Sequence, residues 1–321
     1  MYIYLLIVIV QIIILFVYFK IANRLNIIDK PNERSSHSYI TIRGGGIIFP
    51  VAALLWFFIY GFNYSLIIIA LLTLAAVSFI DDIITLTSKF RMLIHLAAVT
   101  ALFLQLGVFD FQWYVIVLVY LICVGWINAF NFMDGINGIT AIYSIIALGS
   151  FTWLNQSIQF LPQHLINYLI FSVLIFSYFN LRKKAKTFAG DVGSVSMAFI
   201  LAWFMISLII NTGRIEYILF FAVYGIDTVF TIFYRMKRRE NIFEAHRSHL
   251  YQYLSNELKW SHVLVSAIYG IVQIVINIIT IALIFSGNMN WLVFILFLLL
   301  LAAGYLILRH QISGRIRLLS Y

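Results

Sequence analysis

Apolar residues along the chain form about eleven runs, each close to the length that crosses a membrane. A spanning α-helix needs roughly 17–25 predominantly apolar residues. Backbone groups inside a bilayer must also be hydrogen-bonded within their own segment. The pattern therefore predicts an all-α integral membrane protein made of a single polytopic domain, residues 1–321. The expected spans are 2–19, 46–61, 64–80, 91–107, 113–130, 139–155, 165–181, 194–211, 217–234, 261–285 and 291–308.

The basic residues lie almost entirely in alternate loops between these runs. Lys and Arg mark the cytoplasmic side when they gather in short loops. We therefore expect the N-terminus outside and the C-terminus in the cytoplasm. The first run follows no basic leader and precedes no small-residue cleavage site, so we expect it to remain as a helix. Apart from Arg214, every Lys and Arg falls in 20–43, 81–91, 182–193, 235–260 or after residue 308.

Composition supports the membrane assignment and excludes several other classes. Of the 321 residues, 63% are apolar and 10% charged, against roughly 45–50% and 25% in soluble domains. A net charge of +9 would suggest nucleic acid in a soluble protein. Here the loop distribution accounts for it, so we expect membrane lipids and no nucleic acid as partners. The single cysteine, Cys123, excludes an intrachain disulfide.

Two adjacent carboxylates, Asp81 and Asp82, end the third apolar run. They repel one another, and the negative end of the helix dipole disfavours anions at the same place. A bound cation or a catalytic task would explain this arrangement. The alternative is that both carboxylates are simply solvated at the membrane interface.

A polar series closes the fifth run: Asn128, Asn131 and Asp134 recur every three residues. On an α-helix this spacing places them on one half of the circumference. Asn137 and Gly138 follow, and an ordinary Asn-Gly turn would explain these two. Such a turn does not explain the two Asn and the Asp on one helix face before it.

The segment from Phe188 to Ser194 leads into the eighth run and contains Asp191 between two glycines. Free N–H groups and the helix dipole make a helix start a favourable place for an anion. A carboxylate at that place would supply an oxygen ligand of the kind that Mg²⁺ prefers. Gly-Asp turns at helix starts are also common without any ligand.

Three loops carry basic residues that can be explained in two ways. Arg43 precedes three glycines, which indicate close backbone packing or the approach of a phosphate. A lysine run at 183–186 is explained well enough as a marker of the cytoplasmic side. In the largest loop, His246, Arg247 and His249 fit contacts to a pyrophosphate better than a metal site, because no third ligand lies nearby.

Asp227 is an acidic residue within the ninth run, about eight residues, or ~12 Å of helix, before Arg235. A charge at the middle of a membrane costs roughly 2.5–3.5 kcal/mol, and less at shallower depth. We therefore expect Asp227 to face the interior of the bundle and to have a polar partner. The sequence does not indicate which residue this partner is.

Taken in order, these motifs resemble those of the polyprenyl-phosphate N-acetylhexosamine-1-phosphate transferases of glycosyltransferase family 4. Each motif alone is unspecific, but their joint order, spacing and common side are specific, and the likeness covers nearly the whole chain. Eleven spans match the branch that initiates bacterial O-antigen. The motifs lie at 29–34, 43–46, 81–82, 128–138, 188–194 and in the terminal histidine loop.

The resemblance implies that the phosphate of undecaprenyl phosphate attacks the β-phosphorus of a UDP-N-acetylhexosamine, and that UMP leaves. Asp191 looks like the ligand of a Mg²⁺ ion, with Mn²⁺ as an alternative. Asp81 and Asp82 look like the catalytic pair that positions or deprotonates the lipid phosphate, with their individual roles open. Expected substrate-binding residues are Arg43, Asn128, Asn131, Asp134, Asn137, Phe188, His246, Arg247 and His249.

Within that set the resemblance also implies individual roles. Asn131 and Asp134 resemble residues that line the phosphate and nucleotide pocket, and Phe188 resembles an aromatic that packs on uracil. Arg247 and His249 look like part of the sugar-nucleotide loop. The active site is expected at the cytoplasmic face of a bacterial inner membrane, in the loops 20–45, 81–91, 131–138, 182–194 and 235–260.

The sequence departs from the family pattern at two places, and these departures bear on which UDP-sugar is the donor. His249-Leu250 is followed by Tyr251 and Gln252 where peptidoglycan translocases carry consecutive histidines, which argues against a muramyl-pentapeptide donor. Asn137 occupies a position that is often Asp. We expect GlcNAc, FucNAc or QuiNAc as the sugar and O-antigen or a related polysaccharide as the pathway, with a homodimer left open.

A secondary transporter is the alternative function, and it predicts acids spread through the membrane depth.

Overall fold

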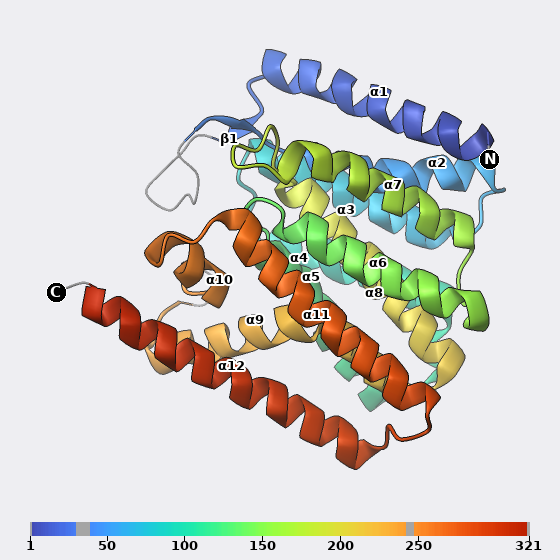
Figure 1. Ribbon diagram of the computed structural model, residues 1–321. Coiled ribbons are helices and arrows are strands. Elements are labelled where there is room, and N and C mark those ends of the chain that lie inside the picture. Colours follow the sequence, from blue (N-terminus) through green and yellow to red (C-terminus); the bar gives the residue numbers. More distant parts are fainter. Residues whose placement is uncertain (1, 30–38, 242–246, 320–321) are drawn as a thin grey trace.

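The computed structural model describes residues 2–29, 39–241 and 247–319, and these form a bundle of long helices (Figure 1). The α-helices are α1 (Tyr2–Arg24), α2 (Ile48–Ile59), α3 (Ser65–Ile83), α4 (Ser88–Leu106), α5 (Trp113–Met133), α6 (Ile139–Ile158), α7 (Gln163–Asn180), α8 (Gly190–Thr212), α9 (Ala222–Lys237), α10 (Leu250–Gln252), α11 (His262–Phe285) and α12 (Trp291–Leu319). Single-turn helices η1 (Gly45–Ile47) and η2 (Val108–Asp110) precede α2 and follow α4, and η3 (Ile215–Phe221) runs into α9.

The apolar pattern predicted the long helices correctly, but not the three-residue helix α10. Every expected span falls on a helix, with the second on η1 and α2 and the ninth on η3 and α9. Among the described residues, 8 helices are long and apolar enough to cross a membrane. The prediction of a multi-pass helical membrane protein is therefore confirmed, while the number of spans and their orientation stay predictions.

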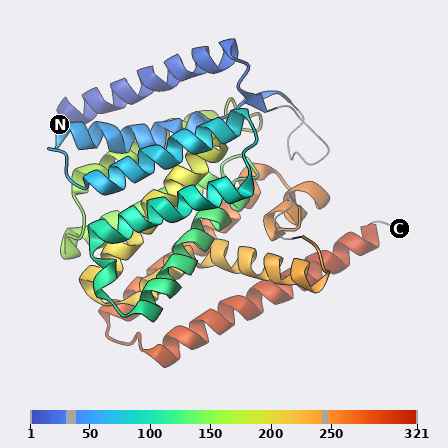
Figure 2. The same ribbon diagram turned by 180° about the vertical axis from the view of Figure 1, so that it is seen from behind.

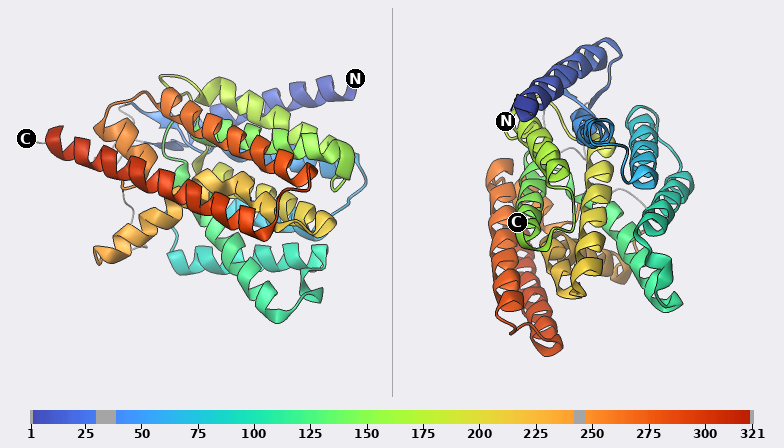
Figure 3. Two further views of the ribbon diagram at one scale, coloured as in Figure 1. Left: turned by 60° about the horizontal axis from the view of Figure 1, so that its bottom comes forward. Right: turned by 90° about the vertical axis from the view of Figure 1, so that its right-hand side faces the viewer.

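Helix α8 is the centre of the bundle and α12 lies at its edge (Figure 3). Of the apolar window in α8, 89% is buried inside the protein, against 6% for α12. Helices α2, α3, α5 and α6 all pack against α8. Because nearly every face of α8 is covered, its first residues are held by neighbours on several sides, and Asp191 is one of these residues.

A small β-ribbon was not predicted. Strands β1 (Ile28–Asp29) and β2 (Thr41–Ile42) pair antiparallel, and Ile42 also forms a parallel bridge with Thr187. Strands of two residues carry no recognisable alternation of apolar and polar positions. The ribbon ties the loop after α1 to the segment that precedes α8.

The polar segments gather at one end of the bundle. Figures 1 and 2 place the β-ribbon, α10 and the C-terminal end of α12 at the end opposite the start of α1. The carboxyl end of α3 and the start of α8 meet at this end as well, since Asp82 accepts a hydrogen bond from the backbone N–H of Asp191. The described parts of the loops predicted to be cytoplasmic therefore share one end.

Glycines allow the loop after β2 to lie directly on the start of α8. The backbone N–H groups of Gly45 and Gly46 donate to the carbonyl oxygens of Phe188 and Ala189, at 2.8 and 3.0 Å. A Cβ atom at Gly193 would lie 2.6 Å from the Cα of Gly46, closer than real contacts allow. Between close packing and phosphate approach, the two roles left open for these glycines, the structure shows close packing.

Gly193→Ala should therefore destabilise the protein by about 1–3 kcal/mol, because the added methyl group overpacks a backbone contact that cannot move apart freely. The measurement is the thermal unfolding midpoint of the purified protein in detergent. Gly149→Ala is the matched control, since no atom lies within 4 Å of a Cβ at Gly149 in α6. Equal midpoints for the two variants would contradict the proposed packing role.

Candidate active site

Asp82 is a buried carboxylate at this end, with a side chain that is 0% exposed. Its Oδ1 accepts a hydrogen bond from the backbone N–H of Asp191 at 2.8 Å, and its Oδ2 accepts one from the backbone N–H of Val192 at 3.1 Å. The Nε of Arg43 lies 2.6 Å from Oδ1 of Asp82, the same oxygen that accepts the N–H of Asp191. A carboxylate at a helix N-terminus satisfies unpaired N–H groups and is favoured by the helix dipole. Asp82 therefore holds the start of α8 and the loop of Arg43 together.

Asp81 points to a different set of partners. Its Oδ1 accepts the backbone N–H of Leu86 at 2.6 Å, and its Oδ2 accepts Nη1 of Arg91 at 2.9 Å. Asp81 also lines a cavity of about 790 Å³. The two adjacent carboxylates thus differ in environment, because Asp82 is enclosed by backbone while Asp81 faces a space large enough for a ligand.

Asp191 faces the same cavity from the first turn of α8, with a side chain that is 19% exposed. Its Oδ1 lies 3.3 Å from Nη2 of Arg43, and its Oδ2 lies 3.8 Å from Nη1 of Arg91. Arg91 thereby contacts both cavity-facing carboxylates. The charged floor of the cavity consists of two carboxylates bridged by a shared guanidinium.

The cavity combines this floor with an apolar wall. It lies between α3, α4, α5, α8 and α9, all of them apolar helices of spanning length, α9 together with η3. A space that is polar at one end and apolar along its side fits an amphipathic ligand. Its lining residues are Ser78, Asp81, Ser88, Lys89, Arg91, Met92, Leu93, His95, Leu96, Asn128, Asn131, Phe132, Asp191, Val195 and Ile232.

The polar series on α5 divides at the end of the helix. Asn128 and Asn131 both line the cavity, as their three-residue spacing predicts, and Asn131 accepts the hydroxyl of Ser194 at 2.7 Å. Asp134 lies just beyond α5, is not among the lining residues, and accepts a hydrogen bond from the hydroxyl of Thr140. Burial raises the pKa of the Asp134 carboxyl to about 6.

Asn137 and Phe188 have backbone-binding roles in the structure and lie outside the cavity lining. The amide of Asn137 is buried and donates to the carbonyl oxygen of Arg182 at 2.8 Å. Phe188 is half-buried, and its backbone bonds to Ile42 and Gly45. Both residues connect the loop before α8 to its neighbours.

The histidine loop packs around Asp227. His246 lies outside the described residues. Arg247 is half-buried, whereas His249 is buried with its Nδ1 3.3 Å from Oδ1 of Asp227. Asp227 also accepts the hydroxyl of Tyr269 at 2.7 Å. These contacts identify the partners that Asp227 was expected to have in the bundle interior.

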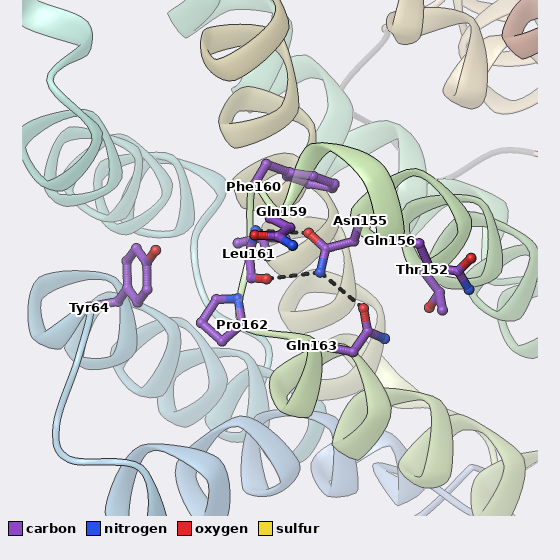
Figure 4. Close-up of a pocket in the computed structure, with 9 residues that line it drawn as sticks. All are labelled: Tyr64, Thr152, Asn155, Gln156, Gln159, Phe160, Leu161, Pro162 and Gln163. Carbon is purple, nitrogen blue, oxygen red and sulfur yellow. Dashed lines mark hydrogen bonds between the residues drawn. The ribbon is translucent and has the colours of Figure 1, made fainter.

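A second pocket of about 690 Å³ lies away from these acids, around the loop between α6 and α7 (Figure 4). Asn155 occupies its centre and donates to the carbonyl oxygen of Leu161 at 2.9 Å and to Gln163 at 3.0 Å. These bonds brace the turn between the two helices. Among the described residues, no acidic, basic or histidine side chain lines this pocket, so the candidate active site is the cavity that contains Asp81 and Asp191.

Sequence reasoning missed two cavity residues on α4. Arg91 was considered only as a marker of the cytoplasmic side, and His95 was not singled out. They are four residues apart on one helix, which places both on the cavity face. The imidazole of His95 is buried, and its Nδ1 has no hydrogen-bond partner among the described residues. The i, i+4 spacing directly after Asp81-Asp82 was the available signal.

The carboxylates suit a cation that takes most of its ligands from the phosphates of a bound substrate. In the described part of the chain, no three His, Cys, Asp or Glu side chains converge in the manner of a complete metal cage. Mg²⁺, however, is usually bound by one or two carboxylates together with substrate phosphates and water. Asp191 and Asp81 face one cavity and provide such a set.

The fold and this site define a multi-pass helical membrane protein with a carboxylate and arginine cluster at one end of the bundle. A family model described as "Glycosyl transferase family 4" matches residues 64–209, from the start of α3 almost to the end of α8. This part of the chain, a little under half of its length, is therefore similar to that family. The matched region contains Asp81, Asp82, Arg91, Asn131 and Asp191, so it covers the charged floor of the cavity, whereas Arg43 lies outside it.

Individual relatives agree with the family match. The chain is 27% identical over 264 residues to a Bacillus subtilis protein named "Probable undecaprenyl-phosphate N-acetylglucosaminyl 1-phosphate transferase", covering 73% of this chain and 71% of that protein. It is 24% identical to the "Undecaprenyl-phosphate alpha-N-acetylglucosaminyl 1-phosphate transferase" of Thermotoga maritima, covering 76% and 78%. A "Phospho-N-acetylmuramoyl-pentapeptide-transferase" of Streptococcus thermophilus is 37% identical, but over only 41% of this chain and 36% of its own length.

Asp82→Ala should lower the free energy of unfolding by about 3 kcal/mol, because two backbone N–H groups of α8 and the Arg43 guanidinium lose a buried charged acceptor. Thermal or denaturant unfolding in detergent measures the loss. Asp110→Ala removes an exposed carboxylate near the other end of α4 and serves as the matched control. If both variants unfold like the wild type, Asp82 does not hold the start of α8.

Proposed function

We propose that the chain transfers GlcNAc-1-phosphate from UDP-GlcNAc to undecaprenyl phosphate and releases UMP. The observation that carries this proposal is the cavity itself, which joins two carboxylates and Arg91 to an apolar wall. A lipid phosphate needs both parts, since its head is anionic and its chain is apolar. The names of the relatives that match about three quarters of the chain favour GlcNAc among the three N-acetylated sugars that the sequence left open.

In the proposed reaction an oxygen of the lipid phosphate attacks the β-phosphorus of UDP-GlcNAc. The bond between this phosphorus and the bridging oxygen breaks, and UMP departs with the electron pair. The lipid phosphate is already ionised at neutral pH, so it does not require a strong general base. The task of the chain is to hold two anionic substrates in line and to offset their mutual repulsion.

Arg43 and Arg91 would perform part of this task. In the described structure they are paired with Asp82, Asp81 and Asp191. About a third of each arginine side chain is exposed, so their remaining N–H groups are open to phosphate oxygens. Arginine binds phosphate in a bidentate manner, which would fix the orientation of the transferred group.

Asp191 and Asp81 would hold Mg²⁺, with Mn²⁺ as an alternative. When bound there, the ion would neutralise charge on the pyrophosphate and on the departing UMP. Asp82 is turned toward the backbone of α8 and supports Asp191 in position. We therefore propose different roles for the adjacent carboxylates, with Asp82 as a positioning residue and Asp81 facing the reaction.

The site would face the cytoplasm of a bacterial inner membrane. The β-ribbon, α10 and the C-terminal end of α12 lie at one end of the bundle (Figure 1), the expected loops of the cytoplasmic side flank these elements, and a UDP-sugar is a cytoplasmic compound. The alternative of a secondary transporter predicted acids along the membrane depth. Asp81, Asp82 and Asp191 instead lie together, which supports the enzyme. O-antigen or a related surface polysaccharide as the pathway, eleven spans and a homodimer stay predictions.

Purified protein in detergent should release UMP only when UDP-GlcNAc, undecaprenyl phosphate and Mg²⁺ are all present. UDP-FucNAc, UDP-QuiNAc and UDP-MurNAc-pentapeptide serve as competing donors and should be poorer substrates. EDTA should abolish release, and excess Mg²⁺ should restore it. Lipid-independent release, or release from none of the donors by folded protein, would contradict the proposal.

Asp191→Asn should reduce turnover by about 100-fold or more, because a metal ligand that supplies several kcal/mol of charge stabilisation is lost. The amide has nearly the same shape, so the unfolding midpoint in detergent should change little. Asp110→Asn, at an exposed site away from the cavity, is the control and should retain full activity. A wild-type rate for Asp191→Asn would overturn the metal assignment.

A further inference from the structure

Helix α12 makes a polar contact that its position at the edge of the bundle does not explain. Only 6% of its apolar window is buried, yet Arg309 near its C-terminal end is 3% exposed. A buried arginine is costly unless its N–H groups are bonded. The partners of Arg309 therefore indicate what this helix does.

Arg309 holds the histidine loop by its backbone. Its Nη2 donates to the carbonyl oxygen of Ser248 at 2.8 Å, and its Nη1 donates to the hydroxyl of Thr231 on α9 at 2.9 Å. The guanidinium also lies 4.8 Å from the ring centre of Tyr234 and 5.4 Å from that of Tyr253. One side chain of α12 thus contacts both α9 and the segment that contains His249.

Tyr305, one turn earlier on α12, extends this contact to Asp227. Its hydroxyl accepts from Arg309 and donates to Oδ1 of Asp227 at 3.0 Å. The same carboxylate accepts the backbone N–H of Leu250 at 3.1 Å and lies 3.3 Å from Nδ1 of His249. Residues 248–250 are therefore held by two side chains of opposite charge, Asp227 and Arg309, which do not contact one another directly.

The segment held in this way adjoins the wall of the active-site cavity. The hydroxyl of Tyr251 donates to the carbonyl oxygen of Phe132 at 2.9 Å, and the ring of His249 lies 6.5 Å from that of Phe132. Phe132 lines the cavity. We expect a water-soluble donor to reach the cavity from the side of the loops, because the apolar wall includes exposed residues, such as Leu93 and Leu96, that suit contact with lipid. Residues 247–251 lie on that side.

We propose that α12 is a positioning element of the donor site, in which Arg309 and Tyr305 hold residues 248–250 against the wall of the cavity. The helix acts through backbone and Asp227 contacts and does not touch substrate. This inference rests on the proposed function where it is tested by KM values. Its test by trypsin digestion does not depend on the proposed function. It also assigns a role to residues that lie outside the region matched by the family model.

Arg309→Gln and Tyr305→Phe should raise KM for UDP-GlcNAc about tenfold, because each removes hydrogen bonds to or from a charged group. KM for undecaprenyl phosphate should change less than about twofold, and kcat should fall less than KM rises. His310→Gln, at the exposed neighbouring position, is the matched control and should behave as the wild type. A purely structural role would instead lower kcat and the unfolding midpoint while leaving the donor KM unchanged, which would overturn the proposal.

The second measurement is limited trypsin digestion of the full chain in detergent, followed by mass spectrometry. Cleavage after Arg247 should be at least several times faster in Arg309→Gln than in wild type or His310→Gln, because Ser248 loses its donor. This holds whether or not UMP is released, so an inactive wild type would contradict the proposed function alone. Unchanged cleavage after Arg247 would show that α12 does not hold the loop.

Discussion

The site depends on one buried interaction, in which the Asp82 carboxylate binds the first N–H groups of α8 and the guanidinium of Arg43. A helix start and a buried carboxylate each need a partner where water is scarce. The bond between Asp82 and the start of α8 gives each of them a partner, and it brings α3, α8 and the loop after β2 to one point. Asp191 and Asp81 face the cavity from positions that this interaction sets.

Asp227 forms a second buried centre of the same kind at the histidine loop. Its oxygens accept from Tyr269, Tyr305 and the backbone of Leu250, so helices from the last third of the chain converge on it. Both carboxylates are fully bonded and hold loops, while the carboxylates that face the cavity keep some exposure. The protein thus separates acids that organise the site from acids that can meet a substrate.

Glycines set the distances on which this arrangement depends. Gly46 and Gly193 touch through their backbones, and the N–H groups of Gly45 and Gly46 bond to the segment before α8. Side chains at these places would push Arg43 away from Asp82 and Asp191. The glycines therefore serve the active site through packing, and the cavity is left to side chains from α3, α4, α5, α8 and α9.

The sequence by itself determined the helices and indicated several of the side chains that line the cavity. Spans follow from apolar length, because a bilayer core has a fixed thickness, and Asn128 and Asn131 share a face because helical spacing requires it. Only the tertiary structure decided that Asp81 and Asp82 have different surroundings, that Arg91 joins the acids, and that Arg309 reaches Ser248. These contacts join residues from separate helices, and no local period in the sequence records which helices will be neighbours.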